Sequence, residues 1–281
     1  MVDEPGSSGG GEQVRTPDDH RPLGRLIGKV AVVTGSANGI GRAIAARMAA
    51  EGAAVCISDR DGDASDTAAH DINNDLASMP TADVGLAFAV PCDVTKGQDV
   101  TRLFRALDDA HGRVDIIVNN AGLNVRGDFR HMSDADWETI RDVNLDGVVR
   151  IARDGFELMR KSGDAALINL ASIMGHRGLR QLTGYSATKG AVSALTRGLA
   201  VEYAPFGIRV NAIAPGFIET ALTERVLRNP MISKALIDQT PLRRFGTTND
   251  IAAAAIFLAS DEARFITGAE LAVDGGMAAG L

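Results

Sequence analysis

The feature that most constrains this chain is a regular alternation, from Lys29 onward, of short apolar runs with longer amphipathic segments. The short runs are rich in β-branched residues and continuously apolar, as strands covered on both faces must be. The seven strands that we expect are Val30–Thr34, Ala54–Ser58, Gly85–Pro91, Val114–Asn119, Ala165–Leu170, Ile208–Ala214 and Glu270–Val273. Because strands that alternate with helices build βαβ units, the pattern predicts a parallel sheet with helices on both faces.

Residues that favour helix N-termini stand ahead of the amphipathic segments. Asp61 and Asp63 precede a predicted helix that runs to Leu76, and Thr95 precedes one over Val100–Ala110. A polar cluster over 133–136 precedes a long segment that we expect to stay helical to Met159, and another long helix is expected over Gly184–Ala204. Between Gly216 and Asp250 two helix-like stretches, Thr220–Leu227 and Met231–Asp238, are interrupted by prolines, which predicts an insertion before the last helix.

Composition bounds the class of protein. A length of 281 residues with 45% hydrophobic residues fits one domain, and 36 acidic against 29 basic residues give a net charge of −7, which argues against nucleic acid as a partner. The longest apolar stretch, Ile251–Ala259, is too short to span a membrane. Cys56 and Cys92 lie in apolar runs, and neither has a second cysteine or a histidine at the spacing of metal ligands. We therefore expect both to be core residues of a protein in a reducing compartment, with no metal bound.

The first residues differ in composition from the rest of the chain. Residues 1–22 mix Gly, Ser, Pro and acidic residues without the apolar core of a signal peptide. We therefore expect a disordered tail over residues 1–25 and a single cytoplasmic domain over 26–281.

A glycine-rich turn follows the first predicted strand. The segment Thr34–Gly41 has the pattern T-G-x3-G-x-G, with Asn38 and Ile40 between its glycines. Gly35 permits a tight turn, Gly39 lets the backbone approach a pyrophosphate, and Gly41 allows close packing of helix on strand. The helix N-terminus adds free N–H groups and partial positive charge, so the turn predicts a dinucleotide site. A plain tight turn is the alternative.

An acidic residue ends the second predicted strand. Asp59 comes 18 residues after Gly41, where a carboxylate can hydrogen-bond an adenosine ribose and repel a 2′-phosphate. The alternative is that Asp59 only caps the next helix, although Asp61 and Asp63 are better placed to do so. Arg60 can offset the charge, but we expect it to point to the other side of the strand end.

Tyr185 and Lys189 are four residues apart in a predicted helix, so both project from one face, and Ser172 follows the fifth predicted strand. A phenol is a poor base at neutral pH, and an adjacent ammonium lowers its pKa. The pattern therefore predicts that Tyr185 exchanges a proton with a substrate oxygen, that Ser172 hydrogen-bonds that oxygen, and that Lys189 tunes the phenol. A half-buried tyrosine and a surface lysine are the alternative.

The motifs described so far are joined by two more, Asn119-Asn120-Ala121-Gly122 and Pro215-Gly216. Together they resemble the compact form of the short-chain dehydrogenase/reductase family, and the resemblance covers the chain from about Leu26 to Gly276. The resemblance implies a three-layer, doubly wound α/β Rossmann fold. It also implies that Asp93 and Val94 touch the adenine and that Asn120, Ala121 and Gly122 line the ribose side. Asn144 is expected to hold a water near Lys189. The nicotinamide is expected to be bordered by Pro215, Gly216, Ile218 and Thr220. Each of these has a purely structural alternative, such as a strand end or a helix cap.

The expected function is an NAD(H)-dependent oxidoreductase that interconverts a secondary alcohol and a ketone. Asn38 stands where many phosphate-preferring relatives carry a basic residue, which favours NAD over NADP. Asn124, Arg126 and the loop Ile173–Thr183, with His176, Arg177, Arg180 and Gln181, are expected to form a polar wall for a polyol, sugar or carboxylated substrate. The alternatives are an NADPH-dependent 3-oxoacyl-thioester reductase and a non-catalytic dinucleotide sensor. Similar proteins form homotetramers, which we also expect here.

Overall fold

The computed structural model describes residues 23–79, 83–221, 223–224 and 228–280. Its centre is a seven-stranded sheet in which all neighbouring strands are parallel, in the order β3-β2-β1-β4-β5-β6-β7. The strands are β1 (Val30–Thr34), β2 (Ala54–Ser58), β3 (Leu86–Ala89), β4 (Ile116–Asn119), β5 (Ala165–Leu170), β6 (Ile208–Pro215) and β7 (Glu270–Val273). The predicted doubly wound fold and its seven strands are confirmed, although β3 and β4 are shorter than the predicted Gly85–Pro91 and Val114–Asn119.

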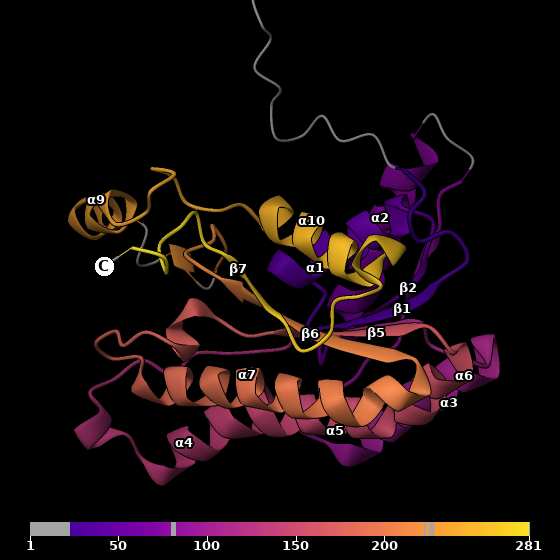
Figure 1. The fold of residues 1–281 in the computed structure, drawn as a ribbon, viewed down its shortest axis with the longest axis horizontal. Helices are drawn as coiled ribbons and strands as arrows, with labels where there is room; N and C mark the ends of the chain where they lie inside the picture. The colour runs from indigo at the N-terminus through magenta and orange to yellow at the C-terminus, as the bar shows by residue number, and fades with distance from the viewer. Residues whose placement is uncertain (1–22, 80–82, 222, 225–227, 281) are drawn as a thin grey trace, which may run out of the picture.

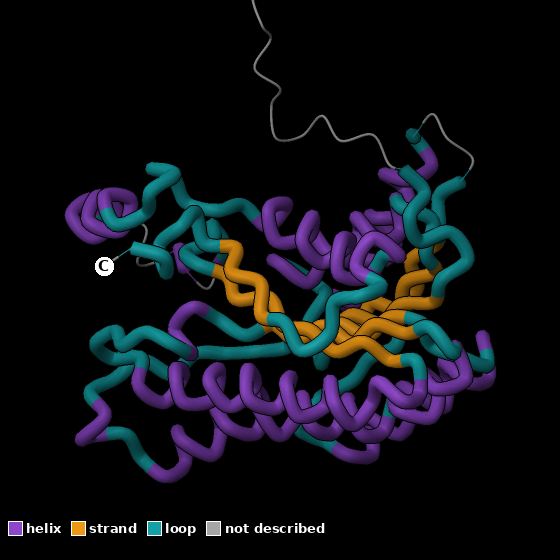
Figure 2. The backbone as a smooth tube through the Cα atoms, in the orientation of Figure 1, coloured by secondary structure: helices purple, strands orange, loops and turns teal. Residues whose placement is uncertain are grey.

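Helices cover both faces of the sheet, as Figures 1 and 2 show. The helices of one face are α1 (Gly39–Ala50), α2 (Gly62–Ala77) and α10 (Thr248–Ala259). Those of the other face are α3 (Gly97–His111), α4 (Asp134–Arg141), α5 (Gly147–Asp154), α6 (Phe156–Ser162) and α7 (Thr183–Tyr203). Helix α9 (Pro230–Asp238) lies away from the sheet, in the predicted insertion. The fold therefore has three layers.

Each face of the sheet has its own apolar core. In β1, Val33 packs with α1 and α10 residues in one cluster, and Val32 packs with α3 residues in the other. Both side chains are fully buried. This two-sided burial is the physical reason why the strands are continuously apolar in sequence.

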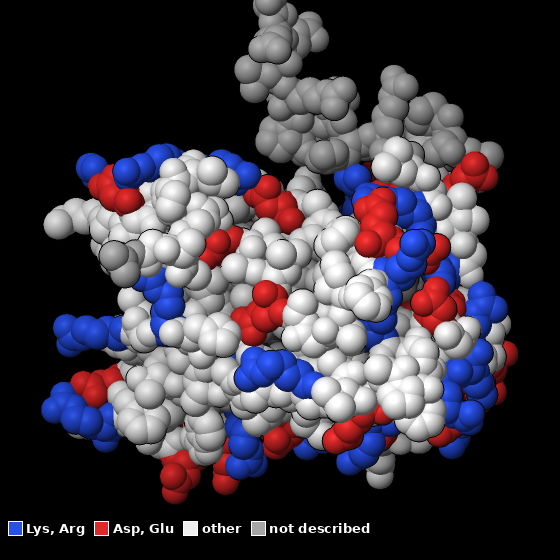
Figure 3. Space-filling model, in the orientation of Figure 1, with Lys and Arg blue, Asp and Glu red and all other residues white. Residues whose placement is uncertain are grey.

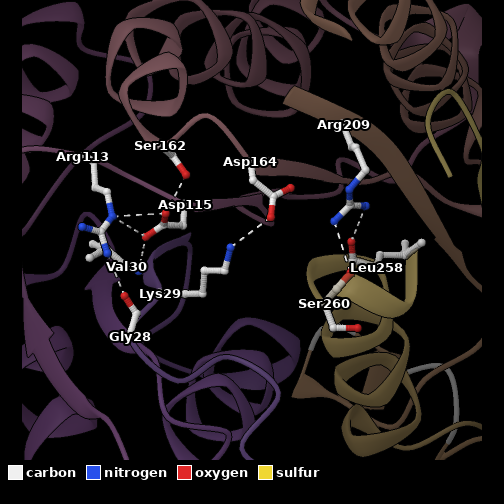
Figure 4. Close-up of polar contacts among 10 residues, drawn as sticks. All are labelled: Gly28, Lys29, Val30, Arg113, Asp115, Ser162, Asp164, Arg209, Leu258 and Ser260. Atoms are coloured by element: carbon white, nitrogen blue, oxygen red, sulfur yellow. Dashed lines mark hydrogen bonds and ion pairs between the residues drawn. The ribbon is translucent and has the colours of Figure 1, made fainter. Parts of the chain in front are cut away.

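Polar contacts tie together the amino ends of the strands (Figure 4). The buried carboxylate of Asp115 accepts hydrogen bonds from the Val30 backbone N–H at 2.7 Å and from the Ser162 hydroxyl at 2.6 Å. At the start of β6, the Arg209 guanidinium donates to the Leu258 carbonyl near the end of α10 at 2.8 Å. This end of the sheet is occupied by its own polar groups, and the large cavity lies at the opposite, carboxyl end.

Two predicted helices differ from the structure. Helix α3 begins at Gly97, three residues before the predicted Val100, and its N-cap is Lys96 and not Thr95, whose hydroxyl donates to Asp93 at 2.7 Å. The long helix to Met159 is broken, because a π-helical turn over Asp142–Asp146 separates α4 from α5 and a break at Gly155 separates α5 from α6. A Cβ at Gly155 would lie 2.6 Å from Ile117, so the absence of a side chain there lets the chain pass close to the sheet.

Two other predictions fall partly outside the described residues. The helix-like stretch Thr220–Leu227 includes undescribed positions, as does most of the predicted tail 1–25. The backbone N–H groups of Leu23 and Arg25 donate to Glu51 at 2.9 and 3.2 Å, so contacts with the domain begin ahead of the predicted boundary at residue 26. Within the described residues, no helix is long and apolar enough to cross a membrane.

Candidate active site

A cavity of about 790 Å³ opens at the carboxyl ends of the strands. In open α/β sheets, ligands bind where the strand order reverses, and here β1 lies between β2 and β4. Of the predicted site residues, the cavity lining includes Gly35, Asn38, Gly39, Ile40, Asp59, Asp93, Val94, Asn120, Ala121, Gly122, Ser172, Tyr185, Lys189, Pro215, Gly216, Ile218 and Thr220. Gly41 and Asn144 do not line it. One cavity therefore brings together residues that are spread from position 35 to position 223 of the chain.

The glycine turn is held against β4 by side chains on both sides. The Asn120 amide donates to the carbonyls of Thr34 and Gly35 at 2.9 and 2.8 Å, and the Thr34 hydroxyl accepts from the Ala121 N–H at 3.1 Å. A Cβ at Gly41 would lie 2.4 Å from the Asn120 amide and from the Gly35 carbonyl oxygen. Gly41 thus permits the predicted close packing of the helix on the strand, although Gly41 does not itself line the cavity.

The same turn leaves room for a phosphate group. Gly39 has φ +57°, and a Cβ built on it would meet no described atom within 4 Å. The N-cap residue Asn38 makes no side-chain hydrogen bond to the first turn of α1, so no side chain caps the N–H groups there. These donors and the open space above them fit the pyrophosphate of a dinucleotide.

Asp59 lies at the end of β2 with its carboxylate turned toward the glycine turn. Its two oxygens accept weak hydrogen bonds from the N–H groups of Ala37 and Asp61, both at 3.4 Å. Asp61 is the N-cap of α2 and accepts from the Ala64 N–H at 3.0 Å, so the helix cap is not supplied by Asp59. Arg60, which we expect to point to the other side of the strand end, is among the residues that line the same cavity as Asp59.

Asp93 and Val94 follow β3 at the far side of this cavity. The Asp93 carboxylate accepts from the Thr95 N–H at 3.0 Å and pairs with Lys96 at 3.3 Å. Burial opposes ionisation of Asp93, but the hydrogen bonds from Thr95 and Lys96 outweigh it and lower its pKa. Val94 packs closely against the start of α5, since a Cβ at Gly147 would lie 2.8 Å from it.

Ser172, Tyr185 and Lys189 meet at the other end of the cavity. Lys189 is 5% exposed, and its Nζ donates to the Leu170 carbonyl at 2.5 Å and lies 5.9 Å from the centroid of the Tyr185 ring. Burial lowers the pKa of Lys189 to about 8. Burial also raises the pKa of Tyr185, and a hydrogen bond with Ser172 opposes that rise. Burial is thus the larger effect on the phenol in this structure, and the tuning of Tyr185 by Lys189 stays a prediction.

Asn144 is fully buried in the π-helical turn behind the cavity. Its amide donates to the Leu123 carbonyl at 2.9 Å and to the Thr188 hydroxyl at 3.3 Å, and its oxygen accepts from the Leu123 N–H at 2.8 Å. The Thr188 hydroxyl in turn donates to the Tyr185 carbonyl at 2.8 Å. Asn144 thus connects the loop after β4 to the helix that carries Tyr185.

The predicted polar wall does not line the large cavity. His176 contacts Glu270 at 2.9 Å and Arg177 donates to the Met277 carbonyl, so both turn toward β7 and the C-terminal segment. Arg126 and Gln181 line a separate pocket of about 120 Å³. Sequence reasoning also missed several lining residues. These are Arg60, Cys92, Thr95, Leu123, Thr139, Asp142, Val143, Leu170, Ala171, Ala221 and Thr223. Leu170 and Ala171 could have been found from their position at the end of β5, whereas Asp142 and Val143 lie in the π-helical turn, which the sequence does not indicate.

Both cysteines are buried and free. Burial raises the pKa of each thiol to about 12, so neither is a ready nucleophile.

The fold and the cavity define a doubly wound α/β protein in which one cavity joins a glycine turn to a serine, a tyrosine and a lysine. A family model described as Enoyl-(Acyl carrier protein) reductase matches residues 35–278. The chain belongs to the short-chain dehydrogenase/reductase family, whose members bind a nicotinamide dinucleotide, and it is an oxidoreductase of CH–OH groups.

Three similar proteins illustrate the range of the family. Galactitol 2-dehydrogenase (L-tagatose-forming) of Cereibacter sphaeroides is 39% identical, over 92% of this chain and 98% of that protein. The 3-oxoacyl-(acyl carrier protein) reductase of Aquifex aeolicus is 35% identical, over 90% and 98%. A gluconate 5-dehydrogenase structure from Burkholderia cenocepacia, in complex with NADP and tartrate, has a TM-score of 0.86 and 33% identity, over 92% and 99%.

Proposed function

We propose that this protein oxidises and re-forms a secondary alcohol on a polar small molecule, such as a polyol or sugar, with NAD(H) as its preferred cofactor. The observation that carries the proposal is that Ser172, Tyr185 and Lys189 border the same cavity as the glycine turn and Asp59. The similarity to galactitol 2-dehydrogenase and to gluconate 5-dehydrogenase supports a polar substrate.

The bound nicotinamide would supply the hydride acceptor or donor. Tyr185 gives a proton to the carbonyl oxygen during reduction and takes it from the hydroxyl during oxidation. Because burial raises its pKa, Tyr185 is a neutral phenol near pH 7, which is the form needed for reduction. Ser172 orients the substrate oxygen beside the phenol. Lys189, with its pKa lowered to about 8, can exchange a proton near neutral pH while the Leu170 carbonyl holds it in place.

The choice of cofactor depends on two neighbouring charges. Asp59 is placed to accept hydrogen bonds from a ribose diol and to repel a 2′-phosphate, whereas Arg60 in the same cavity favours that phosphate. Asn38 supplies no further positive charge. We propose that NAD is preferred, by a margin that Arg60 reduces.

A second candidate is an NADPH-dependent 3-oxoacyl-thioester reductase. It is favoured by Arg60 at the cavity and by the similarity to the Aquifex aeolicus reductase. A dinucleotide sensor without catalysis is disfavoured, because such a protein has no use for Ser172, Tyr185 and Lys189 together.

We further propose a homotetramer, as the resemblance implies. Apolar side chains lie exposed on the surface, among them Val201 on α7 at 77% and Phe265 at 100%, and assembly would bury such groups. A cytoplasmic location remains a prediction from the sequence.

One panel of reactions tests the function. Polyols, hydroxy acids and 3-oxoacyl thioesters are each combined with NAD(H) and with NADP(H), and the absorbance of reduced nicotinamide is followed. The proposal expects the highest kcat/KM with a polyol, sugar or hydroxy acid and NAD. A higher value with a 3-oxoacyl thioester and NADPH would favour the second candidate.

A further inference from the structure

Ser172 lies on a short segment that contacts helix α7 on both sides of the serine. Two residues before it, the Leu170 carbonyl accepts a hydrogen bond from Lys189 Nζ at 2.5 Å. Three residues after it, a 3₁₀ turn ends at Gly175, which meets α7 at Lys189 and Gly190. The position of the serine relative to the helix that carries the phenol therefore depends on these two contacts.

The second contact brings two stretches of backbone together with no side chain between them. A Cβ built on Gly175 would lie 3.0 Å from the Gly190 nitrogen and 3.1 Å from the Lys189 carbonyl carbon. A Cβ built on Gly190 would lie 3.1 Å from the Gly175 carbonyl oxygen. A side-chain carbon rarely approaches backbone atoms so closely, so an alanine at either position should move the turn and the helix apart by a few tenths of an ångström.

Backbone conformation does not explain why either position is glycine. Among the described residues, the glycines with positive φ include neither Gly175 nor Gly190. Gly190 also lies inside α7, where glycine is a poorer helix former than alanine. What glycine provides at both positions is the close approach of the turn to the helix.

The same turn sets the direction of the Ser172 side chain. Ser172 is the N-cap of the turn, and its hydroxyl oxygen accepts a hydrogen bond from the Met174 N–H at 3.2 Å. The Gly175 N–H donates to the Ser172 carbonyl at 2.8 Å. Burial raises the pKa of Tyr185, and a hydrogen bond with Ser172 opposes that rise, as expected of a hydroxyl that donates to the phenol oxygen. A shift of Gly175 would therefore be passed to this hydrogen bond.

We propose that the contact between Gly175 and Gly190 positions the Ser172 hydroxyl against the Tyr185 phenol. Both glycines are positioning residues, since neither lines the large cavity. The inference rests on the proposed function, in which Ser172 and Tyr185 bind the same substrate oxygen. A misplacement of about 1 Å near reacting atoms can cost about 10²-fold in rate, so a shift of a few tenths of an ångström should lower kcat about 10-fold.

The test compares Gly175→Ala and Gly190→Ala with Gly198→Ala in the full-length protein. Gly198 is an exposed residue of the same helix, and a Cβ there would meet no neighbouring described atom within 4 Å, so it is a matched control. The substitutions leave every charge in place, including the Lys, Arg, Asp and Glu side chains that Figure 3 shows mixed on one face. A change at the phenol therefore cannot come from an altered number of charges.

The first readout needs neither substrate nor cofactor. The chain has two tyrosines, so in a Tyr203→Phe background 3-fluorotyrosine incorporated during expression labels Tyr185 alone. Ser172→Ala defines how the fluorine resonance moves when the hydroxyl is lost. We expect both alanine substitutions at the contact to move the resonance in the same direction, and the control substitution to leave it in place.

The second readout separates turnover from cofactor binding. Each variant is assayed with the substrate of highest kcat/KM in the panel of polyols, hydroxy acids and 3-oxoacyl thioesters. We expect Gly175→Ala and Gly190→Ala each to lower kcat about 10-fold and to change the Kd of NADH less than about 2-fold, because the glycine turn is not part of the contact. The double variant should lose less than the product of the two single losses, since both methyl groups push apart the same two segments.

Three results would overturn the inference while leaving the proposed function intact. These are wild-type turnover in both Gly175→Ala and Gly190→Ala, a fluorine resonance that neither substitution moves, and an equal loss of kcat in Gly198→Ala. If Gly175→Ala does not fold, Gly190→Ala decides, because its substitution favours the helix. Binding of NADH by wild type without turnover of any member of the panel would contradict the proposed function, and the fluorine resonance would still decide whether the contact positions Ser172.

Discussion

Replacing Asp59 by Ser should shift cofactor use from NAD toward NADP. A 2′-phosphate carries a charge of about −2, so a carboxylate about 5 Å away repels it by roughly 2 kcal/mol in water and roughly 7 kcal/mol at an effective dielectric constant of 20. Arg60 lines the same cavity, and its positive charge opposes part of that repulsion. A net penalty of about 2 kcal/mol corresponds to a roughly 30-fold preference for NAD in kcat/KM.

The assay is kcat/KM for both cofactors, with one substrate, in wild type and in Asp59→Ser, Asp61→Ser and Arg60→Ser. Asp59→Ser should reduce the preference to a few-fold, mainly by improving the use of NADP. Asp61→Ser removes the same charge two residues away and keeps a residue that can cap α2, so its preference should stay close to that of wild type. Arg60→Ser should widen the preference for NAD.

The reasoning would be refuted by a wild-type preference for NADP or by a ratio that Asp59→Ser leaves unchanged. An equal change of the cofactor ratio in Asp61→Ser would show that the ratio responds to the total negative charge of this region and not to the position of Asp59. Either of the first two results would favour the 3-oxoacyl-thioester reductase.

Three further predictions address pH, stability and assembly. Burial lowers the Lys189 pKa to about 8. The kcat/KM for ketone reduction should therefore be flat below pH 8 and fall above it, whereas the kcat/KM for alcohol oxidation should rise with pH. A reduction rate that is flat to pH 10 would contradict the role of Lys189 in proton exchange. Burial opposes ionisation of Glu51, but hydrogen bonds with Arg25 outweigh this effect and hold the Glu51 pKa at about 2. Glu51→Gln should therefore lower the free energy of unfolding, measured with urea at pH 7, by about 2 to 3 kcal/mol. That difference should disappear between about pH 4.5 and 2, as wild type protonates Glu51, and an unchanged difference at pH 2 would contradict the assignment. Light scattering at micromolar protein should report about four chains, and a fully active monomer would argue against the tetramer.

The sheet was predictable from the sequence because the burial of each strand is visible in the residues of that strand alone. Val30–Thr34 and Ala54–Ser58 match the structure at both ends, since strands buried on both faces must be continuously apolar. The glycine turn was predictable for a similar reason. Gly35 and Gly39 have positive φ, and a Cβ at Gly41 would clash with the Gly35 backbone, so each position favours or requires glycine.

The parts that could not be predicted depend on tertiary contacts. The π-helical turn around Asn144 follows from that side chain binding the distant Leu123 backbone, which no sequence periodicity encodes. Arg60 lies in the cavity lining together with Asp59, which strand alternation alone does not indicate. The direction of the Tyr185 pKa depends on how deeply the folded chain buries the phenol, and spacing to Lys189 cannot supply that depth.

The most direct test of the central claim is the turnover of Tyr185→Phe beside that of Tyr203→Phe. The chain has two tyrosines, and the Tyr203 hydroxyl donates to the Ala152 carbonyl at 3.2 Å in the core, away from the cavity lining. If Tyr185 is the proton donor and acceptor, Tyr185→Phe should lower kcat at least about 10²-fold and still bind NADH, as followed by fluorescence of the reduced nicotinamide. Tyr203→Phe should keep nearly full turnover. Tyr185→Phe with turnover close to that of wild type would contradict the account.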